Sequence, residues 1–299
     1  MSKVLIVGTL ALDSVKTPFG HAQAALGGSA SYASVACSFF SPAHIVSIIG
    51  QDFPKEHLEF LQSKKISLEG VQQKGKTFRW EGFYEFDMNE AKTLKTELNS
   101  LADFQIQMPK SYEDATHVFL ANIDPELQLD VVKNVQKPQQ VVMDTMNFWI
   151  SSKKKSVLAT MEEADIMVLN DGEARQLFDT INLAQAAKKA LSLGPKAVII
   201  KKGEHGALLF TQDKHFNAPG YPLEVVKDPT GCVDCFGGGL IGYLAKEGKH
   251  DEQTLRKAIV YGSVIASYNA EDFSLNRLRT LSHKDIEHRF DEMKQIRQF

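Results

Sequence analysis

The chain has 299 residues, of which 43% are hydrophobic and 24% are charged, and its formal net charge is -3. This length and composition are typical of a globular protein with a large core, and they exclude a chain too polar to fold. Because the charge balance is slightly acidic, we expect neither a nucleic acid nor a membrane as a partner.

Short apolar runs alternate with helical patterns from the start of the chain onward. Runs that are apolar throughout predict strands buried on both faces, as in a parallel sheet. We expect such strands at 4–7, 45–49, 117–120, 140–143, 166–169 and 197–200, with helices between them at 30–39, 128–135, 152–161 and 183–193. The alternation, without a linker or internal repeat, predicts one α/β domain over residues 1–299 with helices on both faces of the sheet.

Residues 17–51 contain no Asp, Glu, Lys or Arg. Prolines, glycines and serines interrupt this stretch, and no unbroken run approaches the ~20 apolar residues of a membrane span. We interpret the stretch as a buried segment of small residues inside the fold. An uncharged wall of this kind also suits a pocket for a polyhydroxylated ligand.

A different pattern interrupts the alternation at residues 77–98. Residues 77–86 and 91–98 alternate with period two around a turn at 87–90, which predicts an antiparallel hairpin. A hairpin inserted between α/β units can close over a site at the strand ends as a lid. A hairpin at the sheet edge that has no role at the site fits the same pattern.

The segment 228–240 is rich in small residues and holds one carboxylate, Asp234, in front of an apolar helical pattern. A turn that leads into a helix presents free backbone N–H groups, and the helix dipole favours a negative charge there. Asp234 therefore either caps this helix or takes a proton from a group beside a bound anion. The chain has no P-loop, no G-x-G-x-x-G after its first strand and no zinc pattern, so phosphate chemistry would rest on this segment.

The pattern Asp-x-Thr-Gly-x-x-Asp at 228–234, followed by Phe236 and the glycines 237–239, resembles the C-terminal signature of the ribokinase-like (PfkB) sugar and nucleoside kinases. Five weaker family patterns precede this segment, and they occur in the family's order. They are the first-strand turn at 8–13, the diglycine signature at 27–28, the G-x-D-x-F turn at 50–53, the N-x-x-E element at 170–173 and the G-x-x-G loop at 203–206. The resemblance implies a ribokinase-like three-layer α/β/α sandwich with a mostly parallel central sheet. It also implies a small β-sheet lid, formed mainly by about 9–20 and 75–100.

The same resemblance implies a kinase that transfers a phosphoryl group from ATP, with Mg²⁺, to an alcohol of a sugar or nucleoside. Phosphoryl transfer needs positioning and charge stabilisation more than covalent chemistry. Asp234 would act as general base on the acceptor hydroxyl. The backbone of Gly231, Cys232, Val233 and Asp234 would hold the transferring phosphoryl group as an anion hole.

The other family patterns imply binding roles for further residues. Asn170 and Glu173 would orient water ligands of Mg²⁺, although an asparagine three residues before a glutamate also makes a helix cap. The implied acceptor site consists of Asp13, Gly27, Gly28 and Tyr32, and the implied nucleotide site of Lys202, Gly203, Gly206 and Thr230. Activation by a monovalent cation near Asp228 and Thr230 is left open by the sequence.

Two residues depart from the family pattern. Val233 stands where the family usually has glycine, and a β-branched residue neither adopts positive φ readily nor leaves space for a phosphate, unless the backbone there is already helical. Tyr32 stands where the family commonly has a substrate-binding asparagine, and its ring either stacks on the acceptor or belongs to the core. These departures keep an alternative open: a catalytically impaired kinase-like protein that binds a sugar or nucleotide as a sensor or partner-binding module.

The hairpin carries a cluster of aromatic side chains: Phe78, Trp80, Phe83, Tyr84 and Phe86. This cluster suits an aromatic base better than a bare sugar and therefore favours a nucleoside as the acceptor. The same side chains also fit the core of the lid itself, or the interface of a homodimer formed through the lid.

The three cysteines, Cys37, Cys232 and Cys235, are too few for a disulfide framework, and the apolar run at the start of the chain is too short for a secretory signal. We therefore expect a cytoplasmic protein. Cys232 and Cys235 form a C-x-x-C pattern at a predicted helix start, where thiols can have a lowered pKa and redox activity. The simpler interpretation is that two small residues flank Asp234, because no thioredoxin-like context surrounds them.

Overall fold

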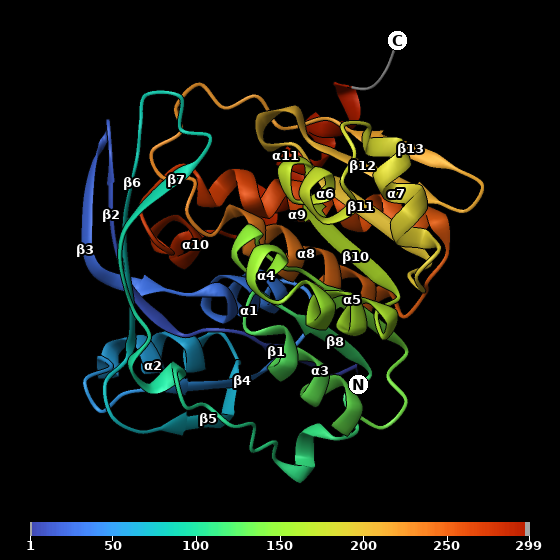
Figure 1. Ribbon diagram of the computed structural model, residues 1–299. Coiled ribbons are helices and arrows are strands. Elements are labelled where there is room, and N and C mark those ends of the chain that lie inside the picture. Colours follow the sequence, from blue (N-terminus) through green and yellow to red (C-terminus); the bar gives the residue numbers. More distant parts are fainter. Residues whose placement is uncertain (1, 297–299) are drawn as a thin grey trace.

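The computed structural model describes residues 2–296, and within them nine strands form one large sheet (Figure 1). The order is β13–β12–β11–β10–β9–β8–β1–β4–β5, with every pair from β11 to β5 parallel and β12 and β13 added antiparallel. The strands are β1 (Val4–Val7), β4 (Ala43–Ile49), β5 (Ser67–Gln73), β8 (His117–Leu120), β9 (Gln140–Met143), β10 (Ile166–Asn170), β11 (Ala197–Lys201), β12 (Ala207–Thr211) and β13 (His215–Ala218). The predicted range 1–299 also includes residue 1 and residues 297–299, which lie outside the described part of the chain.

Helices cover both faces of this sheet, because the central strands are apolar on both sides. In β1, for example, Val4 and Ile6 point into one core, and Leu5 and Val7 point into the other. The first core is covered by α1 (Ser29–Ser38), α2 (Lys55–Ser63), α8 (Cys232–Glu247), α9 (Glu252–Asn269), α10 (Asn276–Thr280) and α11 (His283–Gln295). The second is covered by α3 (Pro125–Asn134), α4 (Asn147–Ser152), α5 (Lys154–Glu162), α6 (Asp171–Phe178) and α7 (Leu183–Leu191). The predicted three-layer α/β/α sandwich is confirmed.

Two of the expected helices have different bounds in the structure. The expected helix at 152–161 is divided between α4 and α5, because Lys153 leaves the helical conformation with φ -135° and ψ 40°. The helix expected at 128–135 begins earlier, at Pro125, because the Asp124 side chain accepts a hydrogen bond from the Glu126 N–H and caps it.

A second, smaller sheet of four strands lies beside the large one, at the left of Figure 1. Its order is β3 (Gly20–Gly27), β2 (Ala11–Thr17), β6 (Phe78–Tyr84) and β7 (Ala91–Glu97). The predicted hairpin is confirmed, since β6 and β7 pair antiparallel, whereas β2 and β6 pair parallel. The sheet also includes β3, which extends beyond the ranges predicted for the lid.

The uncharged stretch 17–51 was expected to be buried, and it is buried where it forms α1 and β4. For residues 20–25 the expectation is wrong. They form the exposed to half-buried part of β3, because this edge strand of the small sheet has no helical layer of its own. Among the helices of residues 2–296, none is long and apolar enough to cross a membrane.

Candidate active site

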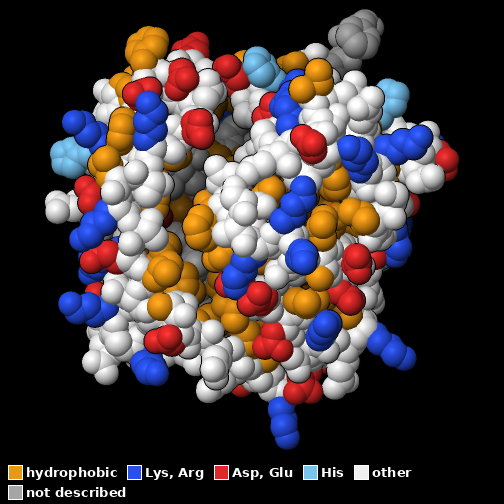
Figure 2. Space-filling model, in the orientation of Figure 1, with side chains coloured by type: hydrophobic (Ala, Val, Ile, Leu, Met, Phe, Trp, Pro, Cys, Tyr) orange, Lys and Arg blue, Asp and Glu red, His pale blue; other side chains and the backbone are white. Residues whose placement is uncertain are grey.

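The predicted site residues lie mainly where the parallel strands of the large sheet end, near the start of α8 and beside the small sheet (Figure 1). The space-filling view shows this face hollowed between the small-sheet side and the side that carries α4 and α6 (Figure 2). A hollow at the carboxyl ends of parallel strands is the usual ligand position in an α/β fold.

The turn before α8 requires glycine at Gly231. This residue has φ 77°, and a Cβ added to it would lie 2.3 Å from the ring of Tyr32. The left-handed backbone and the close ring both exclude a side chain at this position. The helix that follows has no side-chain cap, so the interpretation of Asp234 as its N-cap finds no support.

The first turn of α8 presents backbone N–H groups to the site. The Cys232 N–H donates to the Pro229 carbonyl at 3.1 Å, and it is therefore occupied within the turn. The N–H groups of Gly231 and Val233 have no acceptor within residues 2–296. Val233 lies inside the helix, with its side chain 42% exposed, so valine is compatible with the backbone here.

Asp234, at the third helical position, has its pKa raised to about 7. Loss of hydration is the largest cause, and the negative charges of Asp144 and Asp13 add to it, while the positive charge of Lys201 opposes it. A carboxylate with a pKa near neutrality can exchange a proton with a substrate at physiological pH. This property suits a general base.

Asp13, in β2, is buried beside the diglycine turn. Its Oδ2 accepts the Gly28 N–H at 3.3 Å, and a Cβ on Gly27 would lie 1.9 Å from the same oxygen. Only glycine allows this approach. Burial raises the pKa of Asp13 to about 7, the Gly28 hydrogen bond lowers it, and the charge of Asp228 raises it further. The structure thus brings Asp13, Gly27 and Gly28 together, as the resemblance implied.

Tyr32 is buried in α1, and its ring lies under Gly231. Burial raises the pKa of its hydroxyl well above the usual value, with further contributions from Asp13, Asp228 and other charges around it. Of the aromatic residues in the hairpin, Tyr84 reaches the same turn, since its hydroxyl accepts a hydrogen bond from Thr230 Oγ1 at 3.4 Å. Trp80 instead bonds Thr93 in the neighbouring strand, and Phe86 is 93% exposed.

The predicted nucleotide loop is the tight turn between β11 and β12. The Lys202 N–H donates to the Gly206 carbonyl at 2.7 Å. Gly206 has φ 90°, and a Cβ there would lie 2.0 Å from the Ala218 carbonyl oxygen, so glycine is required. The side chain of Lys202 makes no hydrogen bond or ion pair with any residue in 2–296.

Asn170 and Glu173 form a complete capping box at the start of α6. Asn170 Oδ1 accepts the Glu173 N–H at 2.7 Å, and Glu173 Oε2 accepts the Asn170 N–H at 2.7 Å. The helix cap that the sequence also allowed for this pair is therefore present. Burial raises the pKa of Glu173 to about 7, with Lys201 lowering it and Asp144 raising it.

Sequence reasoning missed the ion pair between Lys201 and Asp144. Lys201 Nζ lies 3.1 Å from Asp144 Oδ1 and 3.0 Å from Oδ2, and both side chains are buried. Burial raises the pKa of Asp144, and the charge of Lys201 opposes this. One signal was present in the sequence, because Asp144 directly follows one apolar strand and Lys201 ends another.

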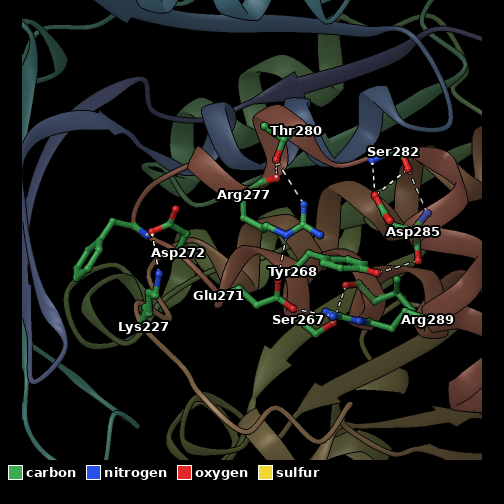
Figure 3. Close-up of polar contacts among 12 residues, drawn as sticks. Lys227, Ser267, Tyr268, Glu271, Asp272, Arg277, Thr280, Ser282, Asp285 and Arg289 are labelled. Carbon is green, nitrogen blue, oxygen red and sulfur yellow. Dashed lines mark hydrogen bonds and ion pairs between the residues drawn. The ribbon is translucent and has the colours of Figure 1, made fainter.

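The turn after α9 holds Asp228 in place. Figure 3 shows the polar contacts of Glu271, Arg277 and Arg289 in this turn. The N–H groups of Lys227 and Asp228 donate to the Ala270 carbonyl at 2.8 and 3.3 Å, and the Ser274 N–H donates to Asp228 Oδ2 at 3.4 Å. Glu271 anchors this turn through ion pairs to Arg277 at 3.0 Å and to Arg289 at 2.6 Å. Asp228 is thereby fixed next to Thr230, whose N–H it accepts at 2.9 Å.

The thiols of Cys232 and Cys235 are directed to different acceptors. Cys232 Sγ contacts the Ala266 carbonyl at 3.4 Å, and Cys235 Sγ contacts the Tyr32 carbonyl at 3.8 Å. Burial raises the pKa of Cys232 to about 12 and that of Cys235 well above its usual value. A reactive pair needs a lowered pKa, so the geometry argues against the redox interpretation.

The family model for the pfkB family carbohydrate kinases matches residues 7–276 of this chain. The chain belongs to this family. As a pfkB-family enzyme it is a kinase of carbohydrates or nucleosides, and the matched range extends from the end of β1 to the start of α10.

Known proteins similar to this pfkB-family chain include nucleoside kinases. A cytidine kinase of Thermococcus kodakarensis is 29% identical over 252 residues, which are 81% of this chain and 89% of that protein. A putative ribokinase II from E. coli, solved in complex with ATP and Mg²⁺, superposes with a TM-score of 0.80 at 18% identity, covering 98% of this chain and 100% of that one. A nucleoside kinase of Burkholderia thailandensis, solved with inosine, has a TM-score of 0.74 at 20% identity, covering 97% and 96%. The two structures show that the chain has the ribokinase fold.

Proposed function

We propose that this chain phosphorylates a hydroxyl group of a nucleoside, with ATP as the phosphoryl donor and Asp234 as the general base. The observation that carries the proposal is the position of Asp234 in the uncapped first turn of α8, with a pKa of about 7. The carboxylates of Asp13 and Asp144 lie close enough to influence that pKa, so the proposed acceptor-binding residue Asp13 lies near Asp234.

In the proposed step, Asp13 accepts hydrogen bonds from the acceptor and orients its reacting hydroxyl. The hydroxyl oxygen attacks the γ-phosphorus of ATP while its proton passes to the Asp234 carboxylate. The bond between the γ-phosphorus and the bridging oxygen breaks, and ADP leaves. The N–H groups of Gly231 and Val233, which lack an acceptor within residues 2–296, donate to the phosphoryl oxygens.

Glu173 is suited to hold a magnesium ion. Its Oε2 is used by the Asn170 N–H, whereas Oε1 has no hydrogen-bond partner within residues 2–296. No group of three or more His, Cys, Asp or Glu side chains in this range is arranged to hold a metal on its own. Mg²⁺ commonly binds through one or two carboxylates together with water and substrate phosphates, so Glu173 is sufficient as a protein ligand. When bound, the ion would neutralise charge on the phosphates.

Asp228 fits a monovalent cation. This carboxylate is 1% exposed and has no ion-pair partner within residues 2–296. The nearby Asn269 donates from Nδ2 to the Thr230 carbonyl at 2.8 Å, and its buried Oδ1 has no hydrogen-bond partner in the described part of the chain. A buried carboxylate and an unpaired amide oxygen together favour a cation. Such an ion would hold the turn at Thr230 in place.

A nucleoside is the acceptor that the observations favour within the family's range of sugars and nucleosides. The similar proteins include a cytidine kinase and a nucleoside kinase solved with inosine. Tyr84 of the small sheet contacts Thr230 beside the site, so an aromatic side chain is present to stack on a base. We propose the small sheet as a lid on this ground.

The alternative, a protein that binds its ligand without turnover, rested on Val233 and Tyr32. Since the backbone of Val233 is helical and its N–H has no acceptor within residues 2–296, the anion hole keeps this donor. The valine side chain beside it is the observation that still favours the alternative.

ATP turnover on a panel of ribonucleosides and sugars tests the proposal. We expect Asp234→Asn to lower kcat about 10²- to 10⁴-fold, the range of general-base catalysis. Asp291→Asn is the control, because Asp291 forms an exposed ion pair with Lys294 in α11. A fully active Asp234→Asn enzyme would refute the general-base role, and phosphorylation of sugars alone would refute the nucleoside. Thermal stabilisation by a ligand without any turnover would favour the alternative.

We further propose a homodimer formed through the small sheet. Phe19, in the turn between β2 and β3, and Leu94, in β7, are large apolar side chains that are 56% and 61% exposed, and an interface through this sheet would cover them. Sedimentation should give a dimer for the wild type and a monomer for Leu94→Glu. A monomeric wild type at micromolar concentration would contradict the proposal.

A further inference from the structure

Lys201 and Asp144 meet above the end of β10. In β11, Ile199 faces the core that contains α8, and Lys201, two residues later, is on the same side. In β9, Val142 faces that core, and Asp144 follows on the same side. Lys201 is paired in register with Asn170 of β10, so its side chain reaches across this strand to Asp144.

The ammonium group of Lys201 retains one N–H donor that has no acceptor within residues 2–296. It has three N–H bonds, and the structure gives it the two oxygens of Asp144 as acceptors. Its side chain is 9% exposed, so the remaining N–H is largely withdrawn from bulk water. Burying a lysine is costly, and a buried ion pair by itself is weak evidence for a stabilising role.

The surroundings of this lysine are acidic. The positive charge of Lys201 lowers the pKa of both Glu173 and Asp234, while the negative charge of Asp144 raises both. Lys201 therefore lies close to the predicted metal ligand and to the predicted base. The negative polyphosphate of ATP would be repelled by these carboxylates unless positive charges lie beside it. A lysine ammonium group commonly binds phosphate in proteins.

We propose that Lys201 binds the nucleotide phosphates through its free N–H, and that Asp144 holds its ammonium group in position for this contact. The proposal rests on the proposed function, because it places a nucleotide polyphosphate at the ends of β9, β10 and β11. It differs from the sequence expectation, which assigned the nucleotide to Lys202. The adjacent Lys202 does not share the buried position of Lys201, since it leaves the strand for the turn at Gly203.

Calorimetric titration of ADP, ATP and the acceptor nucleoside into single variants tests this role without turnover. We expect Lys201→Met to weaken ADP and ATP binding about 10- to 100-fold, because the loss of one hydrogen bond between charged groups changes the affinity by this factor. Nucleoside binding should be unchanged. Lys196→Met is the matched control. Lys196 precedes the same strand at its opposite end, where it pairs with Asp165 at 2.7 Å on the surface.

A double variant separates phosphate binding from charge balance. Lys201→Met leaves the buried Asp144 carboxylate with the Thr145 N–H but without a countercharge, whereas Asp144→Asn combined with Lys201→Met removes both charges. We expect the double variant to fold like the wild type and to bind ADP as weakly as the single variant. Recovery of ADP affinity in the double variant would mean that Lys201 only neutralises Asp144, and this would overturn the proposal.

The remaining outcomes distinguish the two proposals. Unchanged ADP affinity in Lys201→Met, or a loss that appears in Lys202→Met instead, would overturn the role of Lys201 and leave the kinase intact. A wild type that binds neither ATP nor ADP would refute the proposed function itself.

Discussion

The ring of Tyr32 in α1 packs directly against Gly231, the residue that precedes α8. A Cβ on Gly231 would lie 2.3 Å from the ring, so the tyrosine sets how closely the two helices approach at the site. Tyr32 thus has a structural role in forming the turn that positions Asp234, whatever it contributes to the acceptor site.

Replacing Gly231 with alanine should therefore lower the free energy of unfolding by more than backbone strain alone would. A left-handed residue with a side chain costs about 1–2 kcal/mol, and the clash with Tyr32 adds to this and displaces the first turn of α8. Denaturant unfolding and ATP turnover measure the two effects. Gly248→Ala is the matched control, since Gly248 ends the same helix with φ 61° and has open space around it. Equal effects of the two substitutions would contradict the role of the Tyr32 contact.

Replacing Val233 with alanine should raise kcat/KM for ATP by a few-fold. The valine side chain is 42% exposed beside the N–H groups of the turn, where it crowds an approaching phosphate. Alanine removes this bulk and has a higher helix propensity than valine, by up to ~0.7 kcal/mol, so stability should not fall. Steady-state kinetics at varied ATP check the expectation. A lower kcat/KM would show that the valine side chain helps to bind the nucleotide.

The pH dependence of turnover should follow Asp234. Its pKa of about 7 means that the carboxylate is protonated, and inactive as a base, below neutrality. We expect kcat/KM to rise as the pH increases through 7 and to level off above it. Because Lys201 lowers this pKa, Lys201→Met should move the rise to higher pH. A profile that is flat from pH 6 to 8 would argue against Asp234 as the base.

The contribution of Asp13 to the stability of the ligand-free protein should fall as the pH rises from 4 to 7. The pKa of Asp13 is raised from 3.8 to about 7, so the folded state retains a proton over this window that the unfolded state has lost. Stability falls with pH wherever the folded state binds more protons. Thermal unfolding of Asp13→Asn against the wild type tests this, because the stability of the wild type relative to the variant should fall as the pH rises through this window. An identical dependence would contradict the raised pKa.

Glu173 should combine a helix-capping role with a metal-binding role, and the two can be separated. Glu173→Gln keeps an oxygen for the Asn170 N–H but removes the charge, so we expect near-normal stability and a higher Mg²⁺ requirement in turnover. Ser282→Ala is the control, since it breaks the capping box of α11 and should cost about 1 kcal/mol without changing the Mg²⁺ requirement. An unchanged Mg²⁺ requirement in Glu173→Gln would refute the metal-binding role and show that Glu173 only caps α6.

Much of the fold could be predicted from local patterns. The strands that end before Asp144 and at Lys201 carry apolar residues on both faces, as burial on both faces requires. The period-two segments around residues 87–90 predicted their antiparallel pairing correctly. The small sheet was incomplete in the prediction, because β3, which pairs with β2 across a short turn, was not expected as a strand, and because the pairing of β2 with β6 joins segments far apart in the sequence. Pairing partners depend on tertiary contacts that no single strand pattern carries.

By itself, the sequence determined the family, the three-layer sandwich and the position of Asp234 at a helix start, because the spacing of glycines, acids and apolar runs fixes local backbone geometry. It did not determine the conformation at Val233, where either a helical or a glycine-like backbone was open. Only the tertiary structure decided that the backbone is helical, that Tyr32 lies under Gly231, and that Lys201 pairs with Asp144 across β10. Those relationships join residues separated by up to 199 positions, and burial at the sheet ends, rather than local propensity, brings them together.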